Sequence, residues 1–193
     1  AVKLITASGG MKASTSLRSS LLPLADVPLM TACMALGNSL VGAPGKRRVI
    51  VWSEGTAQLD KVYPKDINSA VADSLKKLLP DWTVETGTLT DPEQGCSESS
   101  LKACDVLIWW GHAAHGQVDD AVVELVAEAV WSGMGMIVLH SGHFAKIFKR
   151  LMGAPCNLTW REAGERERLW VTSRHHPIAH GLPEHFELEQ EEM

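Results

Sequence analysis

The 193-residue sequence has a single tyrosine and only four cysteines. The cysteines argue against three classes of protein: zinc-knuckle, thioredoxin-type and disulfide-rich. Cys33, Cys96, Cys104 and Cys156 lack the pair spacing of a zinc knuckle or a thioredoxin-type site. Four cysteines are also few for a disulfide scaffold of this length. We therefore expect free thiols, most of them buried, in a chain long enough for one domain with a hydrophobic core.

Positive charge and long apolar runs are also scarce. The net charge is -5, and the basic residues form no stripe beyond residues 46–48. Without a broad positive field to attract phosphates, we do not expect nucleic acid as a partner. No apolar stretch is long enough to cross a bilayer, so we expect no membrane span.

The first 45 residues carry few charges, and we predict that residues 1–45 are a leader outside the folded domain of residues 46–193. Residues 11–43 have a basic start and an apolar stretch, as an export signal would. Asp26, Pro23 and Pro28 interrupt that stretch, which favours an unstructured leader. We expect a cytoplasmic protein, or an exported one if residues 11–43 act as a signal.

From Arg48 onward, apolar runs alternate with helical periodicity. The pattern predicts strands at 48–52, 82–89, 105–110 and 136–140, and helices at 64–79, 118–131 and 144–152. The strands are nearly all apolar, as is typical of a parallel sheet buried on both faces. Strands that alternate with helices over short links indicate an α/β fold built from βαβ units.

The order is less regular after Gly153. Residues 158–161, 168–172 and 186–191 are predicted strands, the first two joined by a charged turn. No helix follows the last of them to cover the edge of a sheet, so we expect the chain to be a fragment, incomplete at its C-terminus.

Two His-x-x-His segments follow two of the predicted strands. His112 and His115 come after strand 105–110, and His140 and His143 begin at the end of strand 136–140. Ligands of open parallel sheets bind outside the carboxyl ends of the strands. If the strand order is flavodoxin-like, the two strands are neighbours about 5 Å apart, and four imidazoles converge there.

These imidazoles suit two kinds of chemistry. Neutral imidazole is a common ligand of divalent metals such as zinc, so all four histidines are candidate metal ligands. The same groups could instead act as general acid and base or bind sugar hydroxyls directly. The metal interpretation is the weaker of the two because the segments lack the glutamate of a zincin motif.

Ser141 and Glu54 are further candidates at this edge. Ser141 follows a strand and precedes Gly142, as in a nucleophile elbow, but the elbow needs small residues on both sides of the nucleophile. A capping hydroxyl at the start of the next helix is therefore favoured. Glu54 follows the first predicted strand and is either an acid or base partner or a solvated loop carboxylate.

Aromatic residues and a proline-bounded loop complete the candidate set. Trp110 lies at a strand end, where its ring could face a sugar, although tryptophans in such positions more often pack in the core. His176 lies in a loop, residues 175–183, that could cover the histidines, although surface turns also collect such residues.

Four segments carry a resemblance to a known family. Residues 105–112, 133–144, 176–178 and the acidic 187–193 resemble ThuA-like trehalose-utilisation proteins, and the resemblance runs from about Arg47 to the last residue. It implies a fold similar to class I glutamine amidotransferases: a flavodoxin-like, three-layer α/β sandwich with a mostly parallel sheet. The cysteine nucleophile of those enzymes is replaced by His140-Ser141, so glutaminase chemistry is not implied.

The resemblance also implies a function in carbohydrate utilisation, on trehalose-related disaccharides or their keto derivatives. We expect His112, His140, His143 and Glu54 to be catalytic, and Trp110, His115, Ser141 and His176 to contact a small-molecule sugar. Family members often carry a histidine in the loop where this chain reads Ser53 to Gln58. A non-catalytic sugar-binding or regulatory module is therefore the alternative, and assembly into a homo-oligomer is left open.

Overall fold

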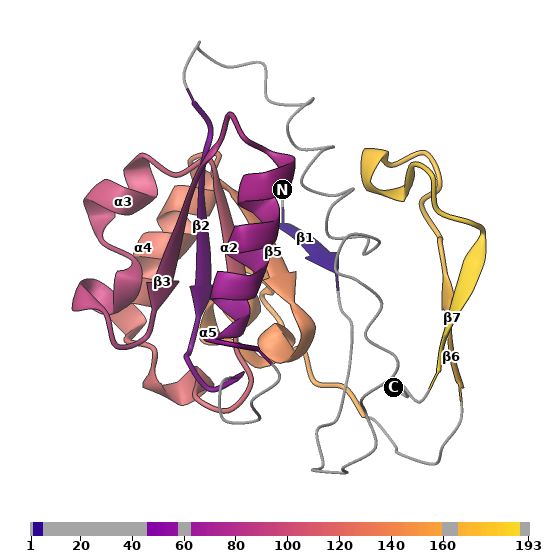
Figure 1. Cartoon of the computed structure of the whole chain (residues 1–193). Coiled ribbons are helices and arrows are strands. Elements are labelled where there is room, and N and C mark those ends of the chain that lie inside the picture. The colour runs from indigo at the N-terminus through magenta and orange to yellow at the C-terminus, as the bar shows by residue number, and fades with distance from the viewer. Residues whose placement is uncertain (1, 6–45, 58–62, 160–165, 190–193) are drawn as a thin grey trace. The chain divides into compact units, whose positions relative to one another are not determined.

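The computed structural model describes residues 2–5, 46–57, 63–159 and 166–189 (Figure 1). The chain divides into two compact units, one of residues 1–7 and 45–157 and one of residues 8–44 and 158–193, which we describe separately. In the first unit the strands are β1 (Val2–Ile5), β2 (Arg48–Ser53), β3 (Thr83–Thr88), β4 (Val106–Trp110) and β5 (Gly135–Leu139). Its α-helices are α2 (Ile67–Leu78), α3 (Glu98–Lys102), α4 (Asp120–Trp131) and α5 (Lys146–Met152).

The sheet of the first unit is parallel, with the strand order β1-β5-β4-β2-β3. From β3 to β5 this is the flavodoxin-like order, and it makes β4 and β5 neighbours as predicted. The winding direction reverses between β2 and β4, where ligands of such sheets bind. Trp52, Trp109 and Val138 stand at one level, so β2, β4 and β5 end together.

Helices cover both faces of the sheet (Figure 1). The face that carries Trp52, Leu107 and Trp109 packs with apolar side chains of α3, α4 and α5 in one core cluster. The opposite face packs against α2, whose buried residues are Asn68, Val71, Ala72 and Leu75. The three-layer α/β sandwich is therefore confirmed.

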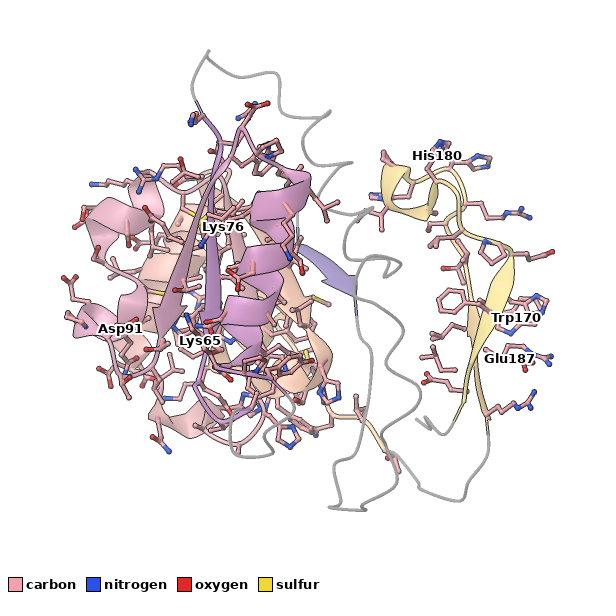
Figure 2. The ribbon with its side chains drawn as sticks, in the orientation of Figure 1. Lys65, Lys76, Asp91, Trp170, His180 and Glu187 are labelled. Carbon is pink, nitrogen blue, oxygen red and sulfur yellow. The ribbon has the colours of Figure 1, made fainter. Side chains whose placement is uncertain are left out.

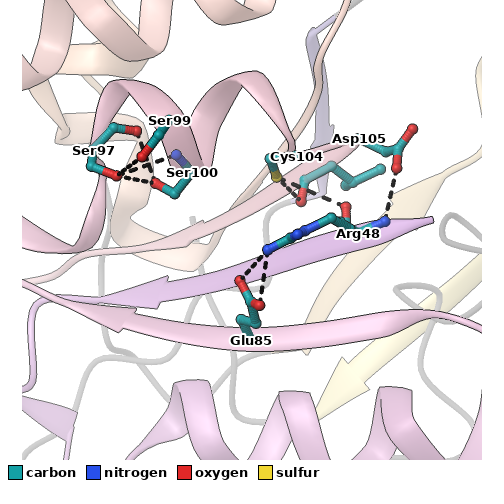
Figure 3. A network of polar contacts seen from close by, with 8 residues as sticks. Arg48, Glu85, Ser97, Ser99, Ser100, Cys104 and Asp105 are labelled. Carbon is teal, nitrogen blue, oxygen red and sulfur yellow. Dashed lines mark hydrogen bonds and ion pairs between the residues drawn. The ribbon is translucent and has the colours of Figure 1, made fainter. Parts of the chain in front are cut away.

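Polar contacts tie the amino-terminal ends of the strands together (Figure 3). Asp105, just before β4, accepts a hydrogen bond from the backbone N–H of Arg48 at 2.8 Å and pairs with the Arg47 guanidinium at 3.0 Å. The Arg48 guanidinium reaches Glu85 on β3 at 3.0 Å. Because these contacts lie at the opposite end of the strands from the histidines, we regard them as structural.

The predicted elements of the first unit are present with shifted ends. The helical period places Leu78 on the buried face of α2, but this last residue of the helix is 39% exposed. Asp66, predicted in the first turn, is instead the residue before the helix, buried and hydrogen-bonded to the Ser53 hydroxyl. The sequence predicts neither α3 nor the 3-10 turn Pro92–Gly95, because both are too short to show a period.

β1 falls inside the predicted leader and pairs with β5 at the edge of the sheet. The remaining leader, including the candidate export signal of residues 11–43, lies outside the described residues. Within the described parts of the chain, no helix combines the length and apolar character needed to cross a membrane.

The second unit contributes a two-stranded antiparallel sheet, β6 (Arg166–Trp170) and β7 (His185–Glu189). The sequence predicts strands close to both positions without assigning their partners, and the structure pairs them with each other. Residues 158–159, expected to begin a strand, are irregular. Leu169 pairs with Phe186, and alternate residues of β6 are exposed.

Candidate functional site

The candidate site lies at the carboxyl ends of β4 and β5, and we refer to the side chains of residues 110–115 and 140–144 as the rim. The chain leaves β4 at Gly111 and enters a 3-10 turn at His115. It leaves β5 directly into a second 3-10 turn, His140–Phe144. Because Trp110 pairs with Leu139 across the two strands, both His-x-x-His segments start at one level of the sheet.

Ser141 connects the two segments. Its hydroxyl lies 2.8 Å from Nδ1 of His112, 2.9 Å from Nδ1 of His140 and 2.8 Å from the carbonyl oxygen of Gly111. The two imidazole rings are 6.0 Å apart between centroids and tilted by 56°. His112 is exposed and His140 is half-buried, so ligands in solution can reach the pair.

The prediction that Ser141 caps the following helix is wrong. Helix α5 begins after Ala145, whose side chain makes no capping hydrogen bond, and the 3-10 turn that contains Ser141 has no side-chain cap either. The hydroxyl instead contacts Nδ1 of His112 and the carbonyl oxygen of Gly111, both in the turn after β4.

The turn after β5 has the shape of a strained elbow, with His140 at its apex. His140 has φ of +50°, a left-handed conformation that few non-glycine residues adopt. A Cβ atom on Gly142 would stand 2.7 Å from Cγ1 of Val138, so the position two residues past the apex requires glycine. The sequence pattern places Ser141 at the nucleophile position, whereas the backbone places His140 there.

Glu54 is buried rather than a solvated loop carboxylate, because its residue is only 6% exposed. One carboxylate oxygen accepts hydrogen bonds from the Thr56 hydroxyl at 2.6 Å and the Ala113 N–H at 2.5 Å, and the other accepts from the Ala114 N–H at 3.0 Å. Glu54 therefore anchors the turn after β4. These backbone donors cannot be identified from the sequence, since no residue type marks them.

The hydrogen bonds decide the ionisation of Glu54. Burial on its own raises the pKa of this carboxyl, but the donors from Thr56, Ala113, Ala114 and the His112 backbone outweigh burial and leave the pKa below its ordinary value. A general acid that works near neutral pH needs the opposite shift. The geometry therefore supports Glu54 as an ionised support of the turn.

Ring nitrogens of His115 and His143 are enclosed by the protein. Both ring nitrogens of His115 and Nε2 of His143 are buried without a hydrogen-bond partner. The His143 ring packs on Phe144 at 4.1 Å between centroids, and His115 lies 6.4 Å from the same ring. Burial lowers the pKa of both histidines, which favours the neutral form of each ring.

The four histidines do not fit one metal ion. Ser141 contacts Nδ1 of His112 and of His140, which leaves only Nε2 of each ring for a metal, while the rings of His115 and His143 pack against Phe144. Among the residues that the structure describes, no group of three or more histidine, cysteine, aspartate or glutamate side chains is arranged to hold a metal ion. Zinc sites need three or four such ligands. The residues present do not fit the zinc interpretation, and no step below uses a metal.

Trp110 is the buried aromatic residue of the rim and lies beside His112. It is 8% exposed, and its ring lies nearly parallel to that of His112, 6.3 Å away at 23°. Trp52 and Trp109 stack on each other at 3.7 Å inside the core. Trp110 therefore backs His112 and offers little surface of its own for stacking on a sugar.

His176 belongs to the second unit, where its Nδ1 accepts a hydrogen bond from the Ile178 N–H at 3.2 Å. The same unit presents Trp170, which is 56% exposed and contacts His185 at 4.8 Å between ring centroids. Figure 2 shows Trp170 and Glu187 projecting from the hairpin. The predicted role of His176 in binding sugar remains a prediction.

The comparisons with known proteins agree with this fold. A crystallised ThuA-like protein from Bacteroides uniformis superposes with a TM-score of 0.56 at 13% sequence identity, covering 80% of this chain and 63% of that one. This chain thus spans less than two thirds of that structure, and the likeness shows the fold alone. A search of curated proteins found no match. The model of the ThuA family, described as trehalose utilisation, matches residues 48–193, and the chain therefore belongs to the ThuA family.

Proposed function

We propose that this chain acts in carbohydrate utilisation, on trehalose-related disaccharides or their keto derivatives, and that His112 and His140 are the residues that contact the reacting part of the sugar. The observation that carries the proposal is the Ser141 bridge between the two rings at 2.8 and 2.9 Å, at the carboxyl edge of the parallel sheet. Membership of a family described as trehalose utilisation supports the substrate class.

Two imidazoles in this arrangement can polarise a sugar from two directions. One ring in its neutral form accepts a hydrogen bond from a sugar hydroxyl and draws off its proton as the reaction proceeds. The other ring in its protonated form donates to a carbonyl or hydroxyl oxygen nearby. Positioned acid-base groups of this kind contribute about 10²- to 10⁴-fold in rate.

The other rim residues have supporting roles in this proposal. Glu54 holds the turn that carries His112, and the rings of His143 and His115 contact Phe144. Trp110 backs the His112 ring.

A non-catalytic sugar-binding module is the second candidate, and the state of Glu54 favours it. Glycoside hydrolysis commonly uses two carboxyl groups that flank the scissile bond. The Glu54 carboxylate already accepts hydrogen bonds from Thr56, Ala113 and Ala114. A rim that offers imidazoles beside an occupied carboxylate could bind a sugar without cleaving it.

Turnover and binding assays separate the two candidates. Purified protein is incubated with trehalose and with its keto derivatives, products are followed by chromatography and mass spectrometry, and binding is followed by calorimetry. His140→Asn suits the left-handed backbone at this position, and His112→Gln removes the other ring. His185→Gln, on the exposed hairpin of the second unit, is the matched control.

The main proposal predicts that each rim variant lowers kcat/KM by at least about 10²-fold while the control stays at the wild-type value. Binding without turnover, lost in the rim variants, would establish the second candidate instead. Turnover that survives in both rim variants would refute the assignment of the histidines.

A further inference from the structure

We infer that Ser141 is a positioning residue that holds His112 and His140 in the same tautomer, with the proton on Nδ1, so that Nε2 is the working nitrogen of both rings. The inference deepens the proposed function and rests on it for its significance. The geometry behind it, however, belongs to the sugar-free protein and can be measured there.

The number of hydrogens at the Ser141 hydroxyl decides which atoms donate. A serine hydroxyl has one hydrogen to donate and two lone pairs that accept. Its three neighbours are the Gly111 carbonyl oxygen at 2.8 Å, His112 Nδ1 at 2.8 Å and His140 Nδ1 at 2.9 Å. A carbonyl oxygen cannot donate, so the serine hydrogen goes to Gly111.

Both imidazoles must then donate to Ser141. With its hydrogen committed to Gly111, the Ser141 oxygen offers only lone pairs to the two Nδ1 atoms. A bare Nδ1 at either distance would place two lone pairs against each other. Each neutral ring therefore carries its single proton on Nδ1 and presents an unprotonated Nε2.

This arrangement suits repeated proton transfer. When a ring takes up a proton, the new hydrogen is added at Nε2, and the Nδ1–H bond to Ser141 is unchanged. A ring can therefore alternate between acceptor and donor at Nε2 while its orientation is kept. Fixing the tautomer through the second ring nitrogen is a general way of preparing a histidine for catalysis.

The single hydrogen of the Ser141 hydroxyl also argues against Ser141 as a nucleophile. An activated serine gives its hydrogen bond to the unprotonated nitrogen of a histidine base. Here the serine hydrogen points at a carbonyl oxygen, and both nearby imidazole nitrogens are donors. The hydroxyl works as an acceptor that aligns two rings.

The Gly111 carbonyl oxygen, which orients the Ser141 hydroxyl, is itself held in place. The residues after Gly111 donate their backbone N–H groups to Glu54, at 2.5 Å from Ala113 and 3.0 Å from Ala114. A side chain at Gly111 would be crowded, since a Cβ atom there would stand 3.0 Å from Nδ1 of His115. A chain of hydrogen bonds therefore runs from Glu54 through the Gly111 turn to Ser141 and the two rings.

The test is the nitrogen NMR spectrum of the histidine side chains in the full chain, free of sugar and at a pH where the rings are neutral. Assignment uses His112→Gln and His140→Asn. We expect His112 and His140 each to show a protonated Nδ1 and an unprotonated Nε2. Protonated Nε2 in either neutral ring of the wild-type protein would overturn the inference, whatever the activity.

Two serine variants add a functional readout. Ser141→Ala should turn both rings into tautomer mixtures and lower kcat/KM by about 10- to 100-fold, mainly through kcat. Ser141→Thr keeps the hydroxyl, so it should show the wild-type tautomers and a kcat/KM close to that of the wild type. A wild-type spectrum with both rings Nδ1-protonated, but no action on any sugar, would refute the proposed function and leave this inference intact. Unchanged tautomers in a folded Ser141→Ala variant would refute this inference alone.

Discussion

At the scale of single residues, the buried carboxylate of Glu54 controls the shape of the rim. Its two oxygens accept hydrogen bonds from Thr56, Ala113 and Ala114, all within 3.0 Å. Three donors to one buried anion compensate the loss of hydration that burial causes. The turn that carries His112 is consequently fixed from the end of β2, a strand that is remote in the sequence.

Replacing Glu54 tests this anchor. We expect Glu54→Gln to lower the free energy of unfolding at pH 7 by about 1.5–3 kcal/mol, because hydrogen bonds to a charged acceptor become weaker or unmatched. Urea denaturation of variant and wild type measures the difference. A loss below about 0.5 kcal/mol, the size expected for an ordinary surface substitution, would contradict the anchor.

The pH dependence follows from the lowered pKa of Glu54. A carboxyl whose pKa is lower in the folded than in the unfolded protein stabilises the fold fully above its unfolded value, about 4.3–4.5. That contribution is lost as the pH falls through the lower folded value. Wild type should therefore lose its stability advantage over Glu54→Gln on acidification from about pH 5, whereas a constant difference would contradict the shift.

Cysteine reactivity is a second residue-scale consequence. Burial raises the pKa of the Cys96 thiol to about 12 and that of Cys104 to about 11. The reactive thiolate is therefore rare at both positions near pH 8. Peptide mapping after iodoacetamide treatment of the native protein should find both unmodified, and both modified in urea. Rapid native alkylation of either would show that the core cluster opens.

At the scale of elements, the turn after β5 depends on a close approach. Gly142 faces Val138 across the elbow, and a Cβ atom added to this glycine would stand 2.7 Å from the valine Cγ1 atom. Since Val138 is fully buried, it cannot move aside without disturbing the core. The elbow thus depends on one residue without a side chain.

A double-mutant cycle tests that dependence. Gly142→Ala should cost about 1–3 kcal/mol of unfolding free energy through overpacking. The same change in a Val138→Ala background should cost markedly less, because the clashing methyl group is gone. Strictly additive effects, measured by urea denaturation, would contradict the proposed contact.

The central elements could be predicted from the sequence better than the peripheral ones. Every residue of β4 is buried, so its apolar run carries a strong signal. β3 mixes exposed and buried residues but lies next to a proline stop, and its predicted ends agree with the structure to within a residue or two. The hairpin of β6 and β7 could not be predicted because the strand pattern does not indicate which partner a strand pairs with.

The candidate site was only partly predictable for the same reason. The carboxyl-end rule and the neighbouring strands sufficed to bring His112 and His140 together. The Ser141 bridge, the left-handed His140 and the amide donors to Glu54 depend on backbone torsions and distances. No residue pattern encodes these. The described side chains do not support the metal interpretation, because ring direction is not visible in the spacing.

At the scale of the whole molecule, protection should follow the distribution of buried residues. The central strands of the parallel sheet are buried, whereas every second residue of β6 is exposed. Hydrogen exchange detected by mass spectrometry should therefore show slow exchange in peptides covering residues 106–110 and faster exchange in residues 166–170. Equal protection would contradict the difference in burial between β4 and β6.

The central claim is that a disaccharide binds against the His112 and His140 pair. Calorimetric titration of the wild-type protein and of the double variant His112→Gln, His140→Asn with a keto derivative of trehalose tests it most directly. We predict saturable binding by the wild type and by His185→Gln, and at least a tenfold weaker affinity in a double variant that remains folded. Equal affinity in the double variant would contradict the claim.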